Sequence, residues 1–169
     1  DTGYIPNAAV GIPVTNATQV TNYISDTTPP LLTAFSLQPL SETLSLTFNE
    51  PVLPSSVNVS SITLYSQPTI SGTVRRLTGG SVVDTSPSLT ITVRLALADT
   101  TFMKLASNFT TSPSNTFLAI DTAGAYDISL NPIQGTVNIM ATSISSGTGT
   151  VYTYLVAYTL DFNTNHLVL

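Results

Sequence analysis

The chain has 169 residues, which is enough for one domain with a sizeable core but too few for two ordinary domains joined by a linker. Charged residues make up 8% of it, the net charge is −5, and four cations are too few to form a basic surface for nucleic acid or an anionic membrane. The absence of cysteine excludes disulfides, thiolate metal sites and cysteine nucleophiles, and no apolar run approaches the ~20 residues of a membrane span.

Residues 1–25 carry alternating apolar side chains at Val10, Ile12 and Val14. This pattern, together with two prolines, predicts an extended segment, because proline interrupts a helix and alternation matches the period of a strand. Since Pro13 cannot donate to a ladder, the segment suits a sheet edge, and its three apolar side chains need a groove to enter. The alternative is a disordered leader.

Residues 26–30 have the sequence Asp-Thr-Thr-Pro-Pro and separate this leader from the domain. Two successive prolines restrict the backbone to extended conformations, including at the residue before each proline. We therefore expect a stiff hinge that carries residues 1–25 away from their own domain instead of folding them back onto it.

Residues 31–145 are expected to form the domain. Its clearest signal is the alternation from Leu32 to Leu37 and from Leu44 to Phe48, which predicts a hairpin. Residues 89–95 also alternate strictly and should cross the middle of a sheet. Further strands are predicted at residues 57–65, 69–77, 116–120 and 128–139, with a turn at Gly79 and Gly80.

Residues 99–106 carry the helical pattern in the chain. Asp99 or Thr100 can cap a helix, and Phe102, Met103 and Leu105 would face inward over about two turns. One short helix among seven or so short strands predicts an all-β fold: an immunoglobulin-like β-sandwich with one short crossover helix and extended N- and C-terminal strand appendages.

Residues 146–169 repeat the start of the domain after a linker rich in Ser and Gly. Leu155–Leu169 aligns without a gap on Leu32–Leu46, at a constant offset of 123 residues. The apolar positions that recur are Leu155, Ala157, Leu160, Leu167 and Leu169. Such a recurrence indicates a repeat architecture. Because an isolated two-stranded hairpin is marginal in water, we expect these strands to form an acceptor surface for a partner.

The motifs Asp26-Thr-Thr-Pro-Pro30, Phe35-Ser-Leu37 and Leu44-Ser-Leu-Thr-Phe-Asn-Glu-Pro-Val52 carry a resemblance to a known family. They look like the tandem immunoglobulin-like repeats of large secreted surface proteins from bacteria and aquatic microbial eukaryotes, and the resemblance covers about residues 14–133. It implies that the hinge joins successive domains and that the chain serves as a stalk, adhesin or fibre subunit. The family's Asp-x-x-Gly-Asn turn is loosened here between Asp121 and Asn131.

Three asparagines, Asn16, Asn58 and Asn108, fit the acceptor pattern for N-linked glycans. The alternative is chance, since Ser and Thr are abundant. A surface poor in charge needs another source of solubility, and we expect all three asparagines on the surface and at least one of them to be glycosylated.

Residues suited to catalysis or metal binding are sparse. His166 is the one histidine and lies in the C-terminal repeat, in a predicted turn, so a Ser-His-Asp arrangement would need its base on an appendage. Asp26, Glu50, Asp121 and Asp127 can converge at one end of the sandwich and suit calcium, but calcium needs six to eight oxygens, and we prefer acids that cap turns. We therefore expect no enzyme activity, no metal and no cofactor beyond N-linked glycans.

Three classes of function compete in this order: a fibre subunit, an adhesin or carbohydrate-binding domain, and a hydrolase fragment. The leader resembles the tail of a preceding repeat, and the C-terminal region resembles the head of a following one. We expect an extracellular or cell-surface filament in which the chain binds itself head to tail. Val10, Ile12 and Val14 of one copy would add as a strand to the C-terminal acceptor surface of the next copy.

Overall fold

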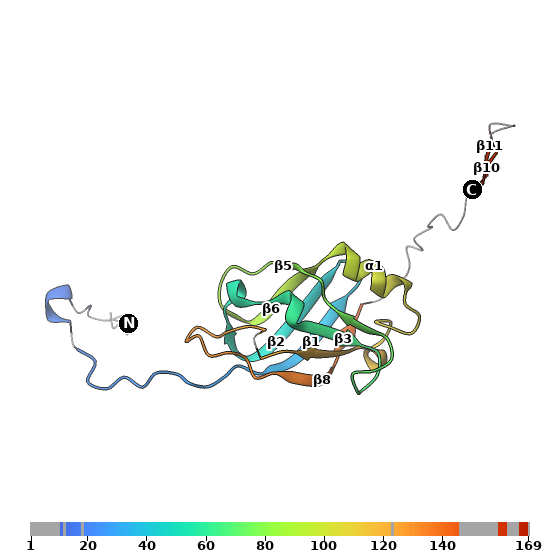
Figure 1. The fold of residues 1–169 in the computed structure, drawn as a ribbon. Coiled ribbons are helices and arrows are strands. Elements are labelled where there is room, and N and C mark those ends of the chain that lie inside the picture. The colour runs from blue at the N-terminus through green and yellow to red at the C-terminus, as the bar shows by residue number, and fades with distance from the viewer. Residues whose placement is uncertain are drawn as a thin grey trace, which may run out of the picture.

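The computed structural model describes residues 11, 13–17, 19–122, 124–145, 159–161 and 166–168, the last two ranges by their backbone alone. Residues 32–144 form a five-stranded and a four-stranded sheet with one short helix (Figure 1). The fold is mostly β and consistent with a β-sandwich, which confirms the predicted all-β class. Among the described residues, no helix has the length and apolar character needed to cross a membrane.

The five-stranded sheet has the order β5-β6-β2-β1-β9. Its strands are β1 (Leu32–Gln38), β2 (Thr43–Val52), β5 (Gly80–Val82), β6 (Ser88–Leu95) and β9 (Ser143–Ile144). The predicted hairpin is confirmed, because β1 and β2 pair antiparallel with Leu37 opposite Leu44. Residues 89–95 form an interior strand, since β6 lies between β2 and β5, although β2 and not β6 holds the middle of the sheet.

The four-stranded sheet has the order β4-β3-β7-β8. Its strands are β3 (Ile62–Tyr65), β4 (Val74–Arg76), β7 (Phe117–Ile120) and β8 (Thr136–Met140), most of them shorter than predicted. The turns η2 (Pro54–Ser56) and η3 (Val59–Ser61) replace the first part of the strand expected at 57–65. The Asn58 side chain caps η3 by accepting a hydrogen bond from the Ser60 amide, which ends the extended backbone there.

Two further predictions in this region are wrong. Residues 128–135 are a loop instead of the first half of a long strand, because Asp127 binds Asn131 and closes a turn. Gly80 begins β5 instead of forming a turn with Gly79. Its φ of 153° and its contact with the Arg94 carbonyl leave no room for a Cβ atom, so glycine lets β5 approach β6.

The core lies between the two sheets, because alternate residues of their strands point inward and contact one another. This inner set includes Leu37, Leu44, Leu46, Ile62, Leu64, Ile91, Val93 and Leu118, all fully buried. A second, smaller cluster of Tyr65, Phe117 and Ala119 is also buried, with the two aromatic rings stacked at 6.0 Å between centroids. The alternation seen in the sequence therefore places the core correctly.

The short helix is α1 (Leu97–Leu105), which begins two residues before the predicted start. Met103 is buried and Phe102 packs against the core as expected, but Leu105 is exposed, which corrects the prediction. Asp99 is not a cap either: the N-cap is Ala96, and Asp99 is fully buried. The turn η4 (Pro113–Asn115) lies between α1 and β7.

The register of the strands defines two opposite ends of the domain. The hinge end holds residues 26–31 and the turn at 127–131, because Val52 bridges Asp127 and Leu31 bridges Gln134. The helix end holds α1 and the turn between β1 and β2, because Arg94 pairs with Thr43. Ser145 also lies at the helix end, where its amide donates to the Leu37 carbonyl. The chain thus enters the domain at one end of β1 and leaves it at the other.

The leader runs away from the two sheets, as the blue trace of Figure 1 shows, and its described residues are all exposed as far as Pro29. It is not extended throughout, because Val14–Asn16 forms the turn η1. Pro13 fixes its own backbone at the start of this turn, and the Asn16 amide donates to the Pro13 carbonyl at 2.8 Å. This turn corrects the prediction of a strand at Val14.

The C-terminal repeat contains β10 (Thr159–Asp161) and β11 (His166–Val168), which pair antiparallel. Leu160 lies opposite Leu167, as Leu37 lies opposite Leu44 in the β1–β2 hairpin. The backbone register of the two hairpins is therefore the same at the offset of 123 residues seen in the sequence. His166 begins β11 and does not lie in the turn where the sequence placed it.

Candidate functional site

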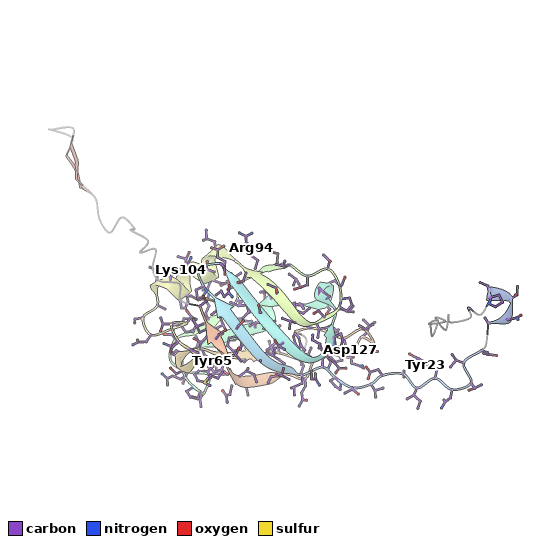
Figure 2. The ribbon with its side chains drawn as sticks, turned by 180° about the vertical axis from the view of Figure 1, so that it is seen from behind. Tyr23, Tyr65, Arg94, Lys104 and Asp127 are labelled. Atoms are coloured by element: carbon purple, nitrogen blue, oxygen red, sulfur yellow. The ribbon has the colours of Figure 1, made fainter. Side chains whose placement is uncertain are left out.

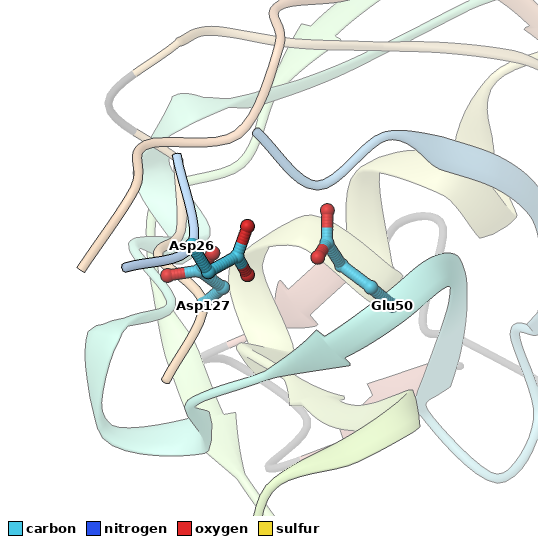
Figure 3. Close-up of side chains that lie close together, drawn as sticks. All are labelled: Asp26, Glu50 and Asp127. Carbon is cyan, nitrogen blue, oxygen red and sulfur yellow. The ribbon is translucent and has the colours of Figure 1, made fainter. Parts of the chain in front are cut away.

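Three carboxylates meet at the hinge end of the domain. Glu50 lies near the end of β2, Asp127 bridges the last residue of that strand, and Asp26 precedes the two prolines of the hinge. One oxygen from each lies within 4.8 Å of the others, and Figure 3 shows the three side chains converging from separate parts of the chain. We call this group the acidic cluster.

Hydrogen bonds hold two of the three carboxylates in place. Both carboxylate oxygens of Asp127 accept hydrogen bonds from Asn131. The backbone N–H of Asn131 donates to Oδ1 at 2.7 Å, and its side-chain Nδ2 donates to Oδ2 at 2.8 Å. The same side chain donates to the Asp26 carbonyl at 3.2 Å, and the Thr28 amide donates to Oδ1 of Asp26 at 2.9 Å. The turn at 127–131 thus fixes the hinge to the domain and brings Asp26 beside Asp127.

Glu50 is the carboxylate without such support. Its Oε1 atom is buried and has no hydrogen-bond partner among the described residues. Burial raises the pKa of the Glu50 carboxyl above its ordinary value, and repulsion from Asp26 and Asp127 raises the pKa further. A cation at this place would therefore stabilise the ionised form of Glu50.

The sequence offered four acids that can converge at this end but favoured separate acids that cap turns; the structure brings three of the four together. Asp121 instead pairs with Arg76 at 2.9 Å, and both side chains are largely exposed. Carboxylate oxygens suit calcium, which needs six to eight oxygens, and three carboxylates supply at most six. The acidic cluster can attract a metal ion or a cationic side chain, and neither is selected by these three residues alone.

The three candidate glycosylation sites lie on the surface, as predicted. Asn16 ends η1, Asn58 caps η3, and Asn108 follows α1 with a φ of 54°. All three are exposed. Their glycosylation stays a prediction, because exposure is a requirement for the modification and not a sign of it.

Most residues expected to join one subunit to the next lie outside the described residues: Val10, Ile12, Leu155, Ala157 and Leu169. Val14 is described and is 95% exposed, so it packs against nothing in its own domain. Leu160 and Leu167 are paired in the β10–β11 hairpin. That hairpin is a separate two-stranded sheet, hydrogen-bonded to neither sheet of the domain in the part of the chain described.

A shallow groove of about 340 Å³ opens beside β5 and the start of η2. It is lined by Leu53, Pro54, Ser55, Val82, Asp84, Thr85 and Pro87. Sugar-binding sites usually stack a ring on an aromatic side chain, and this lining has none. The groove therefore gives no support to a carbohydrate-binding function.

Sequence reasoning missed the buried ion pair between Asp99 and Arg75. The Arg75 guanidinium lies 2.7 Å from Asp99 and 4.9 Å from the centre of the Phe102 ring. Thr78 also donates to Asp99 from its amide at 2.9 Å. The sequence signal was an Asp in the first turn of a helix, which usually marks a cap, and nothing local pointed to an arginine 24 residues away.

Comparison of this chain with protein-family models, with curated proteins and with solved structures found no match.

Proposed function

We propose that this chain is a structural subunit of an extracellular filament, with an immunoglobulin-like sandwich as its body, and that its copies join head to tail. The observation that carries this proposal is the position of the two ends. The leader joins the domain at the hinge end, and Ser145 lies at the helix end, separated by the length of β1, about 20 Å. Domains connected in this way form a line instead of a compact cluster.

The leader supports the proposal because its apolar side chains lie in solvent. Val20, Tyr23 and Ile24 are exposed along with Val14, although each has a large apolar surface. A run of such residues next to a proline hinge is costly to leave in water and favours contact with another chain.

Strand addition is the joint that fits these residues. Val10, Ile12 and Val14 of one copy would enter a groove on the next copy, formed with Leu155, Ala157, Leu160, Leu167 and Leu169. Burial of three aliphatic side chains contributes about 1.5–3 kcal/mol each. Opening the hydrogen bond from the Asn16 amide to the Pro13 carbonyl in η1 costs about 1 kcal/mol, which is less than this gain. Because donor and acceptor surfaces differ, the joint repeats without closing and yields filaments.

The register of the β10–β11 hairpin also supports strand addition. Its register copies that of the β1–β2 hairpin, whose β2 pairs with β6 over most of its length. By analogy β11 would pair with a strand on its outer side, as β2 does with β6. A strand from another copy can fill that place.

This function needs no catalytic residue and no cofactor, and we propose that the chain is not an enzyme. An adhesin or carbohydrate-binding repeat was the alternative, and no described feature favours it over the filament.

Deletion of residues 1–25 tests the proposal, with electron microscopy of the purified full chain as the reference. The deletion variant should remain folded and monomeric, and so should the double variant Ile12→Asp and Val14→Asp. The double variant Asn22→Asp and Ser25→Asp is the matched control, because it places the same charges in the leader at exposed polar positions outside the proposed strand. Filaments of normal length from the deletion variant would refute strand addition by the leader.

A further inference from the structure

The strand β9 closes one edge of the five-stranded sheet, and its pairing with β1 is a strand joint inside the domain. The two strands run parallel, with Ser143 beside Ser36 and Ile144 beside Leu37. The Ser145 amide donates to the Leu37 carbonyl at 3.1 Å. Ile144 packs against the core, whereas Ser143 and Ser145 are exposed. One inward apolar side chain between two outward polar ones therefore fixes the register of β9 on β1.

The leader repeats the segment that contains β9. Residues 17–22, Ala-Thr-Gln-Val-Thr-Asn, align without a gap on residues 141–146, Ala-Thr-Ser-Ile-Ser-Ser. The alignment places Val20 at the position of Ile144, again between two polar residues. Its offset is 124 residues, one more than the offset of the C-terminal hairpin. The two parts that pair inside the domain, the β9 segment and the β1–β2 hairpin, thus recur together, one on each side of it.

In the described part of the chain, neither recurring part has the neighbour that its counterpart has in the domain. Val20 is 71% exposed, and Figure 2 shows Tyr23 of the same leader well clear of the two sheets. The strands β10 and β11 form a separate two-stranded sheet, so the outer edge of β10 lacks the strand that β9 adds to β1. Figure 1 shows this hairpin and the blue leader on opposite sides of the domain.

We infer that residues 19–21 of one copy add in parallel to β10 of a second copy, with Val20 beside Leu160 as Ile144 lies beside Leu37. A second copy is the partner because this chain carries both halves of the joint, separated by its own domain. The inference rests on the proposed filament and deepens it, since it assigns a direction, a register and a specificity-determining residue, Val20, to the contact between copies.

The remaining contacts follow from the β1–β9 pair. Gln19 lies beside Thr159, as Ser143 lies beside Ser36, and the Thr21 amide donates to the Leu160 carbonyl. Backbone hydrogen bonds of this kind hold any extended segment, whereas the inward side chain selects one register. The outer edge of β11 stays open to the strand already proposed for it.

Cysteine cross-linking tests the register, because the chain has no cysteine of its own. Two full-length variants, Gln19→Cys and Thr159→Cys, are mixed before assembly and then oxidised. Neighbouring strands lie about 4.8 Å apart, within reach of a disulfide, so the mixture should give a covalent dimer that neither variant gives alone. Thr21→Cys mixed with Asp161→Cys should do the same, and this second pair establishes the parallel direction. Gln19→Cys with Asp161→Cys is the control, because these positions are two residues out of register and should react roughly tenfold less.

A pair of leader variants provides a second measurement by sedimentation velocity. Val20→Asp should weaken self-association roughly tenfold or more, because it places a charge on the inward side of the added strand. Gln19→Asp is the matched control with the same charge one residue away, on the outward side, and should have little effect. Both variants should keep the fold of the domain by circular dichroism, since these leader residues are exposed.

The outcomes separate this inference from the proposed function. Absence of wild-type self-association at every concentration would overturn both. Filaments that depend on residues 1–25 but give no Gln19–Thr159 cross-link, or cross-link the control pair equally well, would overturn the register alone and leave strand addition in place. If a cysteine variant does not assemble, the leader variants decide: a loss confined to Val20→Asp supports the register, and equal effects of Val20→Asp and Gln19→Asp refute it.

Discussion

Asp99→Ala should be among the most damaging single substitutions in this domain. The Asp99 carboxylate is 0% exposed and accepts hydrogen bonds from Arg75 and from both the amide and the hydroxyl of Thr78. Removing it leaves a guanidinium without its counter-charge and an amide without its acceptor. It also removes the tie between α1 and the segment that contains β4.

The expected loss of folding free energy in Asp99→Ala follows from how deeply Asp99 and Arg75 are buried. Breaking a buried ion pair by removing one member usually costs about 3–5 kcal/mol. The Arg75 side chain is 22% exposed and can regain some hydration, which places the expected loss near the lower limit, about 3 kcal/mol. For a domain of this size, such a loss lowers the melting temperature by roughly 10 °C.

Asp121→Ala is the matched control, because it breaks the neighbouring Arg–Asp pair of similar geometry. That pair has an N–O distance of 2.9 Å, but its side chains are 60% and 59% exposed. An exposed pair contributes about 0–1 kcal/mol, so this variant should melt within a few degrees of wild type. Urea unfolding and thermal melting of both variants provide the comparison. Equal losses in the two variants would refute the reasoning from burial.

Three other outcomes are expected. Glu50→Gln should raise the free energy of unfolding at neutral pH, and this gain should shrink as the pH falls. The reason is that burial and two neighbouring carboxylates raise the pKa of native Glu50 above its unfolded value, so ionised Glu50 destabilises the fold above that pKa and protonated Glu50 does not. A gain that is constant from neutral to acid pH, measured by urea unfolding, would contradict this cause. Leu37→Ala should cost about 2–5 kcal/mol because Leu37 is fully buried, whereas Leu40→Ala, in the half-exposed turn, should cost far less. Peptide mapping of native material after glycosidase treatment should find at least one of Asn16, Asn58 and Asn108 modified; three unmodified amides would require another source of solubility.

Local pattern determined a large part of the fold. The β1–β2 hairpin and β6 were predicted from alternation alone, because a strand with one buried face repeats every two residues whatever its partner is. The C-terminal hairpin was predicted from repetition, and its register matches that of the first hairpin. The helix was predicted to within two residues at its start.

Local pattern failed where a side chain has a distant partner. Asp99 looked like a cap, but it binds Arg75 across the fold. Residues 128–135 looked like a strand, but the hydrogen bonds between Asp127 and Asn131 make them a loop. Gly80 looked like a turn residue, although it serves close packing of β5 on β6.

For the acidic cluster, too, the sequence supplied the candidate residues and the tertiary structure decided which of them meet. Sequence alone allowed Asp26, Glu50, Asp121 and Asp127 to converge at one end of the domain, but it favoured separate acids that cap turns. Only the tertiary structure separated them, by placing Arg76 beside Asp121 and leaving the Glu50 oxygen buried without a hydrogen-bond partner among the described residues. The physical reason is that strand period and turn preference act over a few residues, whereas charge pairing and desolvation depend on which distant segments meet.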